Sequence, residues 1–598
     1  MRKSQFHYYL LVLLLISNVL LAGTGKPAVE FTLSMERPNT HYFHVSVRCS
    51  GFNGQYQEFR MPVWTPGYYL LMDYPKNVIN FKATSPSGNI LTLEKFAKNG
   101  WKINTGGFTD FIIEYDVFAF ARSVADSYLD EDQAFVSPTG IFIYPAGQKH
   151  LSPKVKIVPF SGWKKITTGL ELLPNEPGAY TASDFDILYD SPILIGNQEV
   201  IAFDVKGVPH EFAGSFLGKV DRDALVSTLS KIIESSVSMM GDLPYKHYSF
   251  IVIGPGGGGL EHLNSQAITL SPGSLSTPAS IKRLQSFLAH EYFHHYNVKR
   301  IRPIVLGPFD YDRENLTNML WVSEGITVFY EAVVLYRAGL ITQEEFLEHF
   351  RSNISRYENV PGRLHQSATE SSYNTWLQFF SRNPNSSNTT ISYYDKGAAL
   401  GLLLDLKIRH ETKGKKSFDD VMRFLYSQYY KKENRGFTDA EFREACGKIC
   451  GTDPTEIFEY ASTTKEIDYN KYLAYAGLEI DNNPKPVPGA LLGARIQDQN
   501  GQAVVSSIEF NTPAYNSSLS IQDEIIAINE TRVTARNFNE LLNGFKGGDK
   551  INITVSRGGR IKEIAIELAP RFEKSFRISF TGNPTPEQQL IQDGIFKQ

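Results

Sequence analysis

The chain has 598 residues, with 60 basic and 64 acidic side chains and a formal net charge of −4. Hydrophobic residues make up 42% of the chain and charged residues 21%, which is an ordinary balance for a folded globular protein. These values argue against a disordered chain, a collagen-like chain and a protein with many membrane spans. The near-neutral charge gives no general attraction to nucleic acid or to anionic lipid. The length predicts about three to four domains.

The first residues are typical of a secretory signal peptide. Arg2 and Lys3 precede an apolar run from Tyr8 to Ala22, which ends in small residues. A membrane anchor is the alternative, but an apolar run of ~15 residues is shorter than the ~20 that span a bilayer. We therefore predict a signal peptide over residues 1–23. The product would be exported, periplasmic or extracellular, with no stable membrane span after cleavage.

Residues 24–205 are predicted to form a β-rich N-terminal domain. Apolar and polar residues alternate in several short runs, and turn signals such as Pro66-Gly67 separate them. The clearest runs are Phe43–Val47, Phe111–Tyr115 and Gly140–Tyr144.

From residue 206 to 480 the pattern is mainly helical, and residues 225–233 mark one amphipathic helix. A short predicted strand at 247–253 leads into four consecutive glycines, Gly256 to Gly259. The run lacks the Lys-Ser/Thr of a phosphate-binding loop. Glycines at a strand end let another backbone come close, so we expect a substrate peptide to bind along Gly258 and Gly259.

His290-Glu291-Tyr-Phe-His294 is the strongest chemical motif in the chain. Residues four apart on a helix share a face, so both imidazoles can reach one metal ion, and zinc suits such nitrogens. Glu291 is offset by one residue and lies beside the metal, where it can take a proton from bound water. Thr277 and Pro278 are typical of the start of the helix that carries the motif. The alternative is three polar groups on an exposed helix face.

A catalytic zinc site needs a third protein ligand and an open position. Glu324 begins an apolar helical segment and supplies a candidate, which would make a two-His, one-Glu site. Glu331 lies two turns further along the same face, with Thr327 between them. Either Glu331 or Thr327 could orient a ligand imidazole; a solvated helix charge is the equal alternative for Glu331.

The C-terminal part becomes β-rich again after a proline-rich segment, residues 481–488, which is predicted to be a stiff linker. We expect a β domain over residues 489–570 and a tail over 571–598. Gly558-Gly559 between two apolar runs predicts a hairpin turn. Only three cysteines occur, so a disulfide scaffold is excluded. Cys446 and Cys450 are four apart and either pair or are two small buried side chains.

Several ordered motifs together resemble the gluzincin metallopeptidases, and within them the glycyl-aminopeptidase family that carries a C-terminal PDZ domain. The resemblance covers nearly the whole mature chain. The stretches that carry it are Met61–Tyr69, Gly257–His262, His290–Pro303, Leu320–Gly325, Ile391–Gly397 and, for the PDZ domain, Asn511–Asn529. In the last of these, Ser518 and Gln522 stand where PDZ domains usually have glycine.

The resemblance implies a thermolysin-like domain in which His290, His294 and Glu324 bind one zinc ion and Glu291 is the general base. It further implies that Glu261 binds the substrate's α-amino group. The sequence here is Gly-Gly-Gly-Leu-Glu-His, which departs from the Gly-x-Met-Glu-Asn of related aminopeptidases, so His262 either shares that role or is a structural hydrogen-bonding residue. The same resemblance assigns Tyr394 to the oxyanion, with Tyr393 as the neighbouring alternative.

The predicted fold is therefore multidomain α+β: a β-rich N-terminal domain, a mainly helical zinc peptidase domain and a PDZ-like β domain. The predicted function is a zinc aminopeptidase that removes small N-terminal residues such as Gly or Ala, with peptide substrates and no nucleic-acid partner. The PDZ domain is expected to bind a peptide or a protein C-terminus. Two alternatives are an exported zinc endopeptidase and a non-catalytic PDZ peptide-binding or chaperone-like protein.

Overall fold

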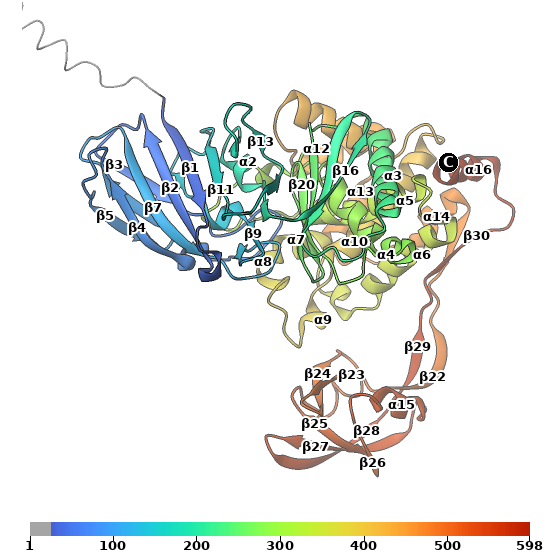
Figure 1. The fold of residues 1–598 in the computed structure, drawn as a ribbon. Coiled ribbons are helices and arrows are strands. Elements are labelled where there is room, and N and C mark those ends of the chain that lie inside the picture. Colours follow the sequence, from blue (N-terminus) through green and yellow to red (C-terminus); the bar gives the residue numbers. More distant parts are fainter. Residues whose placement is uncertain (1–25, 598) are drawn as a thin grey trace, which may run out of the picture. The chain divides into compact units, whose positions relative to one another are not determined.

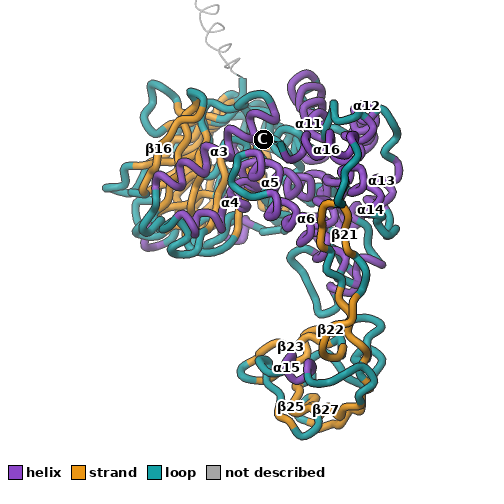
Figure 2. The backbone as a smooth tube through the Cα atoms, turned by 90° about the vertical axis from the view of Figure 1, so that its right-hand side faces the viewer, coloured by secondary structure: helices purple, strands orange, loops and turns teal. Residues whose placement is uncertain are grey.

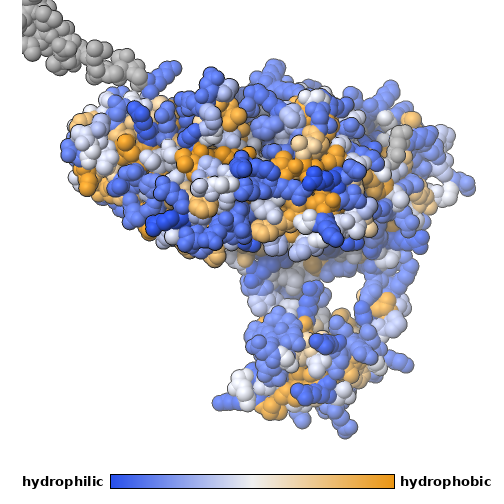
Figure 3. Space-filling view, viewed as in Figure 1, coloured by the Kyte–Doolittle hydropathy of each residue, from blue (hydrophilic) through white to orange (hydrophobic). Residues whose placement is uncertain are grey.

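The computed structural model describes residues 26–597, so the predicted signal peptide lies outside the described residues. The chain divides into two compact units. The first contains residues up to 226 with 244–281 and 308–314, and the second contains 227–243, 282–307 and 315–598. No helix among the described residues is long and apolar enough to cross a membrane. Figure 3 shows hydrophilic residues over much of the face turned to the viewer, with smaller hydrophobic groups among them.

The first unit is built on β-sheets, as the alternating sequence pattern predicts (Figure 1). In β2 every second side chain is buried, including Phe43, Val45 and Val47. The largest sheet has the order β13-β14-β11-β1-β2-β7-β4. Its strands are β1 (Ala28–Ser34), β2 (Tyr42–Ser50), β4 (Val78–Thr84), β7 (Phe111–Phe118), β11 (Lys154–Val158), β13 (Glu171–Leu172) and β14 (Ala179–Thr181).

Two four-stranded sheets complete the β-rich part. One has the order β10-β3-β6-β5 and the other β12-β15-β9-β8. Their strands are β3 (Tyr56–Arg60), β5 (Leu93–Ala97), β6 (Gly100–Asn104), β8 (Tyr128–Leu129), β9 (Gln133–Val136), β10 (Tyr144–Pro145), β12 (Lys165–Thr168) and β15 (Ile193–Gly196), and one short helix, α2 (Phe185–Tyr189), follows β14.

The prediction of a strand over Gly140–Tyr144 is wrong for most of the segment. Pro138 begins a 3₁₀ turn that ends at Gly140, and only Tyr144 and Pro145 pair with a neighbouring strand. Residues 141–143 are fully buried, so no side of this segment faces solvent. The apparent alternation therefore reflects packing on all sides, which periodicity alone does not distinguish from a strand with one buried face.

A five-stranded sheet in the first unit carries the glycine run. Its order is β16-β17-β18-β20-β19, and its strands are β16 (Glu199–Val205), β17 (Val208–Gly214), β18 (Tyr248–Gly254), β19 (Gly258–Glu261) and β20 (Ser265–Thr269). Strand β19 pairs antiparallel with β20. Within residues 26–597 no strand pairs with its other side, so Gly258 and Gly259 lie on a sheet edge.

The second unit is mainly helical over residues 282–476, as Figure 2 shows by its purple segments. Helices α3 and α4 each begin in residues of the first unit and continue into residues of the second. The helices are α3 (Arg222–Met240), α4 (Pro278–Phe293), α5 (Ile326–Arg337), α6 (Gln343–Glu358), α7 (Ala368–Tyr373), α8 (Thr375–Gln378), α9 (Ser386–Thr389), α10 (Tyr393–Glu411), α11 (Phe418–Leu425), α12 (Asp439–Cys450), α13 (Thr455–Ser462) and α14 (Tyr469–Leu473).

The C-terminal β module has a sheet in the order β23-β24-β25-β27-β28, with β26 paired to β25. Gly558 and Gly559 both have positive φ and form the predicted hairpin turn between β27 and β28. The elements are β23 (Ala494–Gln499), β24 (Gln502–Ile508), β25 (Glu524–Ile528), β26 (Thr531–Arg532), α15 (Phe538–Asn543), β27 (Lys550–Arg557) and β28 (Arg560–Glu567).

The segments on either side of this module are ordered and paired. Residues 485–491, at the end of the predicted linker, form β22, which pairs with β29 (Ala569–Glu573). Residues beyond 573 add β30 (Arg577–Phe580), which pairs with β21 (Leu478–Asp481), and helix α16 (Pro586–Phe596). The proline-rich segment therefore behaves in part as an edge strand, where proline is tolerated. Cys49, Cys446 and Cys450 are all buried free thiols.

Candidate metal centre

Helix α4 presents the two histidines of the motif from one face. Thr277 caps its start, because its Oγ1 accepts a hydrogen bond from Ser280 N at 3.1 Å, and Pro278 occupies the first turn, as predicted. At the other end, His294 N still bonds to the His290 carbonyl at 3.3 Å. The helical offset of four residues is therefore preserved through His294, just past the end of the helix.

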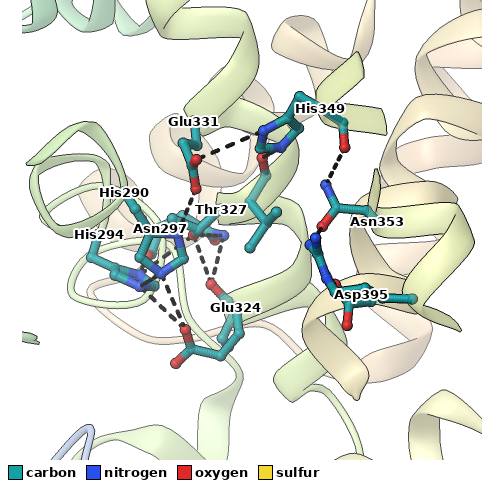
Figure 4. Close-up of polar contacts among 12 residues, drawn as sticks. His290, His294, Asn297, Glu324, Thr327, Glu331, His349, Asn353 and Asp395 are labelled. Carbon is teal, nitrogen blue, oxygen red and sulfur yellow. Dashed lines mark hydrogen bonds and ion pairs between the residues drawn. The ribbon is translucent and has the colours of Figure 1, made fainter. Parts of the chain in front are cut away.

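Glu324 joins these histidines from a second element. It lies in a wide π-helical turn, η5 (Trp321–Gly325), at the start of α5, and it is 3% exposed. Oε2 of Glu324 is 3.2 Å from His294 Nε2 and 3.8 Å from His290 Nε2, and the two Nε2 atoms are 3.0 Å apart (Figure 4). His290, His294 and Glu324 therefore form a group that could hold a metal ion.

The electrostatics of this group favour a positive charge. Burial opposes charging of His290, but hydrogen bonds to Glu324 and Glu331 raise its pKa to about 10. Burial would raise the pKa of Glu324, but the charge of His294 and hydrogen bonds from both imidazoles lower it to about 2. Glu324 and Glu331, the carboxylates that favour the protonated form of His290, would also offset the charge of a bound cation.

Glu331 and Thr327 lie beside the two imidazoles (Figure 4). Oε2 of Glu331 is 3.5 Å from His290 Nδ1. Thr327 Oγ1 donates to the Ser323 carbonyl at 2.7 Å and lies 3.4 Å from His294 Nδ1. Both predicted orienting residues therefore contact the side of an imidazole that faces away from the three-donor group.

Asn297 is a central residue that the sequence reading missed. Its Nδ2 lies within hydrogen-bonding distance of three acceptors on the Glu324 segment: Val322 O at 2.9 Å, Ser323 O at 3.1 Å and Thr327 Oγ1 at 3.0 Å. Its own carbonyl accepts from His294 Nδ1 at 2.8 Å, so Nε2 is the nitrogen of His294 that faces Glu324 and is available to a metal ion. The residue that follows, Val298, has φ +123°, an unusual backbone conformation for a β-branched residue.

The two candidate tyrosines have different surroundings. Tyr393 is 2% exposed, and its hydroxyl bonds to Thr375 Oγ1 at 3.1 Å, which makes it a core residue. The Tyr394 ring lies 6.4 Å from the ring of His290. Tyr394 is therefore the member of the pair that faces the metal-binding group. Ser392 caps the helix on which it stands, α10, by accepting from Asp395 N at 3.2 Å.

The neighbouring His295 is one residue out of helical register with His290 and His294 and lies outside the metal-binding group. It is fully buried, and its Nδ1 hydrogen-bonds to the Tyr292 carbonyl.

The first unit holds the predicted substrate residues. Glu261 ends the edge strand β19 and is 6% exposed. His262 follows, and its Nδ1 lies 3.1 Å from Asp190 Oδ1, while the other oxygen of Asp190 accepts from Leu263 N at 2.9 Å. This buried pair agrees with the structural alternative for His262. No local pattern pointed to Asp190, which lies 72 residues away in sequence.

A turn from the N-terminal β-domain packs directly on Glu261. Gly67, with φ +87°, lies so close that a β-carbon there would be 2.7 Å from Glu261 Oε1 and 2.7 Å from Leu260 Cδ1. Gly67 belongs to the Met61–Tyr69 stretch, which the sequence singled out without a role. Glycine at this position is what allows the turn to approach the carboxylate.

The fold and the paired-histidine centre define a metallopeptidase of the aminopeptidase type. The chain matches the domain models of the M61 glycyl aminopeptidases, the family that its motifs resemble. Its residues match, in order, the peptidase M61 N-terminal domain over 30–197, M61 glycyl aminopeptidase over 283–400 and a PDZ domain over 490–568.

Solved structures also resemble this chain. A crystal structure of an aminopeptidase N family protein from Idiomarina loihiensis is 26% identical, with a TM-score of 0.86, and the match covers 95% of this chain and 100% of that one. An M1 zinc metallopeptidase from Deinococcus radiodurans is 9% identical, with a TM-score of 0.45, over 74% of this chain and 95% of that one. No curated protein matches.

Proposed function

We propose that this protein is an exported, zinc-dependent aminopeptidase that removes small N-terminal residues, Gly or Ala, from peptides. The observation that carries the proposal is the convergence of the two imidazole nitrogens and one carboxylate oxygen. Tetrahedral zinc with bonds of ~2.0–2.1 Å would separate its ligand atoms by about 3.3 Å. The separations here are 3.0, 3.2 and 3.8 Å, so His290, His294 and Glu324 suit zinc in size and in chemistry.

Glu291 is the residue that moves protons in this proposal. Bound zinc would supply Lewis-acid polarisation and make a water molecule acidic near neutral pH. Glu291 is 7% exposed and follows His290 directly on α4, so its carboxylate belongs to the same end of the helix. It takes a proton from the attacking water and delivers it to the leaving amine.

Tyr394 stabilises the negative charge that develops on the scissile carbonyl oxygen. A hydroxyl donor fixed near the reacting atoms before the reaction needs no reorganisation during it. The position of the Tyr394 ring beside His290 supports this role, and the core packing of Tyr393 favours Tyr394 over its neighbour.

Glu261 and the β19 edge bind the substrate. The free edge at Gly258 and Gly259 offers main-chain hydrogen bonds to an extended peptide. The Glu261 carboxylate pairs with the substrate's α-ammonium group, which restricts cleavage to the first peptide bond. The match of residues 283–400 to the M61 glycyl aminopeptidase model supports a preference for a small first residue such as Gly. The PDZ domain would bind a peptide C-terminus from a substrate or a partner.

Glu291→Gln tests the chemistry. We expect zinc content and melting temperature to remain at wild-type values while kcat on glycyl-p-nitroanilide falls by about 10²–10⁴-fold. Glu344→Gln, on the exposed side of α6, is the matched control. Wild-type turnover by Glu291→Gln, or turnover that resists a chelator, would contradict the proposal. Equal cleavage of free and N-acetylated glycyl peptides would instead indicate an endopeptidase.

A further inference from the structure

Helix α6 carries a polar stripe that faces both the metal-binding group and the start of α10. The stripe consists of His349, Asn353 and Arg356, which lie at positions i, i+4 and i+7 and therefore share one helix face. Asn353 is 1% exposed, which is unusual for an amide unless its hydrogen bonds are made. Figure 4 shows His349 and Asn353 between Glu331 and Asp395.

One end of the stripe reaches His290 through Glu331. His349 Nδ1 is 3.8 Å from Glu331 Oε1, and Nε2 of the same ring bonds to the Val328 carbonyl at 3.1 Å. The other oxygen of Glu331 is the one that lies 3.5 Å from His290 Nδ1. His349 thus lies against one oxygen of the carboxylate whose other oxygen contacts the imidazole of a proposed metal ligand.

The other end of the stripe reaches the residue after Tyr394. Asn353 Nδ2 donates to the His349 carbonyl at 3.0 Å, and its Oδ1 accepts a hydrogen bond from Arg356. Arg356 Nε donates to Asp395 Oδ1 at 2.8 Å. Asp395 stands in the first turn of α10, so this ion pair holds the turn that carries Tyr394.

We propose that the stripe His349–Asn353–Arg356 positions the two halves of the reaction centre: Arg356 fixes Tyr394 through Asp395, and His349 fixes His290 through Glu331. The proposal rests on the proposed role of Tyr394. Arg356 is 58% exposed, and an exposed ion pair contributes about 0–1 kcal/mol to stability. An effect of Arg356 on turnover that exceeds its effect on stability therefore reports positioning.

Arg356→Met and Arg351→Met form the central comparison. Arg351 lies on the same helix but pairs with Glu348 of its own turns. We expect Arg356→Met to lower kcat about 10-fold, with KM, zinc affinity and melting temperature within experimental scatter of wild type, and Arg356→Lys to recover part of the loss. Arg351→Met should keep wild-type kcat. Equal kcat in Arg356→Met and wild type, or equal losses in the two methionine variants, would overturn the proposal.

A double-mutant cycle separates this proposal from the proposed function. If Arg356 acts through Tyr394, Arg356→Met should cost no further turnover in a Tyr394→Phe background, whereas additive losses would refute the connection. If Tyr394→Phe alone keeps wild-type kcat, the oxyanion role of Tyr394 fails, and the Arg356 assignment fails with it. If Tyr394→Phe loses turnover but Arg356→Met keeps the wild-type value, the oxyanion role of Tyr394 stands and only the positioning role of Arg356 is refuted.

His349 has a readout that does not depend on turnover. We expect His349→Leu to weaken zinc binding about 10-fold in a competition titration with a metallochromic chelator, because Glu331 would lose the imidazole beside its Oε1. Arg356→Met should leave the same zinc titration unchanged. A zinc affinity that is unchanged in His349→Leu, or that falls equally in both variants, would contradict the two-ended arrangement.

Discussion

Gly325 and Gly397 meet at the point where the Glu324 turn crosses helix α10. A β-carbon at Gly325 would lie 2.5 Å from Gly397 Cα, and a β-carbon at Gly397 would lie 2.4 Å from the Trp321 carbonyl oxygen. Gly325 follows Glu324 directly, and Gly397 is three residues after Tyr394. The absence of side chains at both glycines thus sets how closely a metal-binding carboxylate and the proposed oxyanion donor approach one another.

Gly397→Ala should force this crossing apart. Because the clash is with backbone atoms that have no rotamer to change, we expect a loss of about 1–3 kcal/mol in unfolding free energy, with weakened zinc binding. Urea unfolding and a zinc titration would measure both. Gly447→Ala, within α12, is the control. A β-carbon at Gly447 would lie no closer than 3.6 Å to a neighbouring atom, Cδ of Pro454, which is an ordinary contact. That control should be neutral or stabilising, as alanine favours a helix over glycine.

Asn297→Ala should weaken the metal centre without touching a ligand. The substitution removes the amide that contacts three acceptors on the Glu324 segment and leaves buried carbonyls unpaired. We expect about 1–3 kcal/mol of destabilisation and a 10–100-fold loss of zinc affinity. Equilibrium dialysis against zinc would measure the second effect. An affinity equal to that of wild type would show that the asparagine merely fills space.

Gly67→Ala should disturb recognition of the substrate amine. The added methyl group would lie 2.7 Å from the Glu261 carboxylate, so the carboxylate must move. We expect KM for glycyl-p-nitroanilide to rise about 10-fold, equivalent to about 1.4 kcal/mol of lost binding. Gly88→Ala is the matched control, because Gly88 has nearly the same φ, +84°, but no atom within 4 Å of the added carbon. If Gly67→Ala and Gly88→Ala had identical KM values, the contact between the added methyl group and Glu261 would have no effect on substrate binding.

His210 should make the first unit sensitive to acid. Burial lowers the pKa of His210 to about 4, although its hydrogen bond to the Val208 carbonyl opposes the shift. Between pH 6.5 and 4 the unfolded chain binds a proton that the folded chain excludes, so stability falls as the pH falls. The slope from this one group is at most about 1.4 kcal/mol per pH unit.

His210→Gln should remove that slope while keeping a polar partner for Tyr245, whose hydroxyl lies 2.9 Å from His210 Nε2. Urea unfolding at pH 6.5, 5.5 and 4.5 would compare the two proteins. As the pH falls, the unfolding free energy of the wild-type protein should decrease relative to that of His210→Gln. A constant difference over this range would contradict the assignment.

The sequence predicted the features that depend on short-range spacing. The alternation of β2 and β7, the helical offset of His290 and His294, and the hairpin at Gly558 are all present. The strand predicted for Gly140–Tyr144 was wrong, because this segment is buried on all sides and its residue pattern therefore does not show which side faces the core.

The supporting residues of the site were less accessible to sequence reasoning. Asn297, Asp190 and Arg356 act through contacts with distant parts of the chain, and each is an ordinary polar residue in its local context. The choice between Tyr393 and Tyr394 likewise needed the position of each ring. A motif identifies ligand types, whereas the residues that aim those ligands are fixed by tertiary packing.

The three buried thiols give the protein a built-in reporter of local opening. Cys49 lies in strand β2 of the first unit, and Cys446 and Cys450 lie in helix α12 of the second. A thiol reagent can modify each cysteine only when its surroundings open, so labelling rates would follow the opening of the β-sheet and the helical layer separately. Peptide mapping of the labelled protein, with and without zinc, would then show how far metal binding slows the opening of each unit.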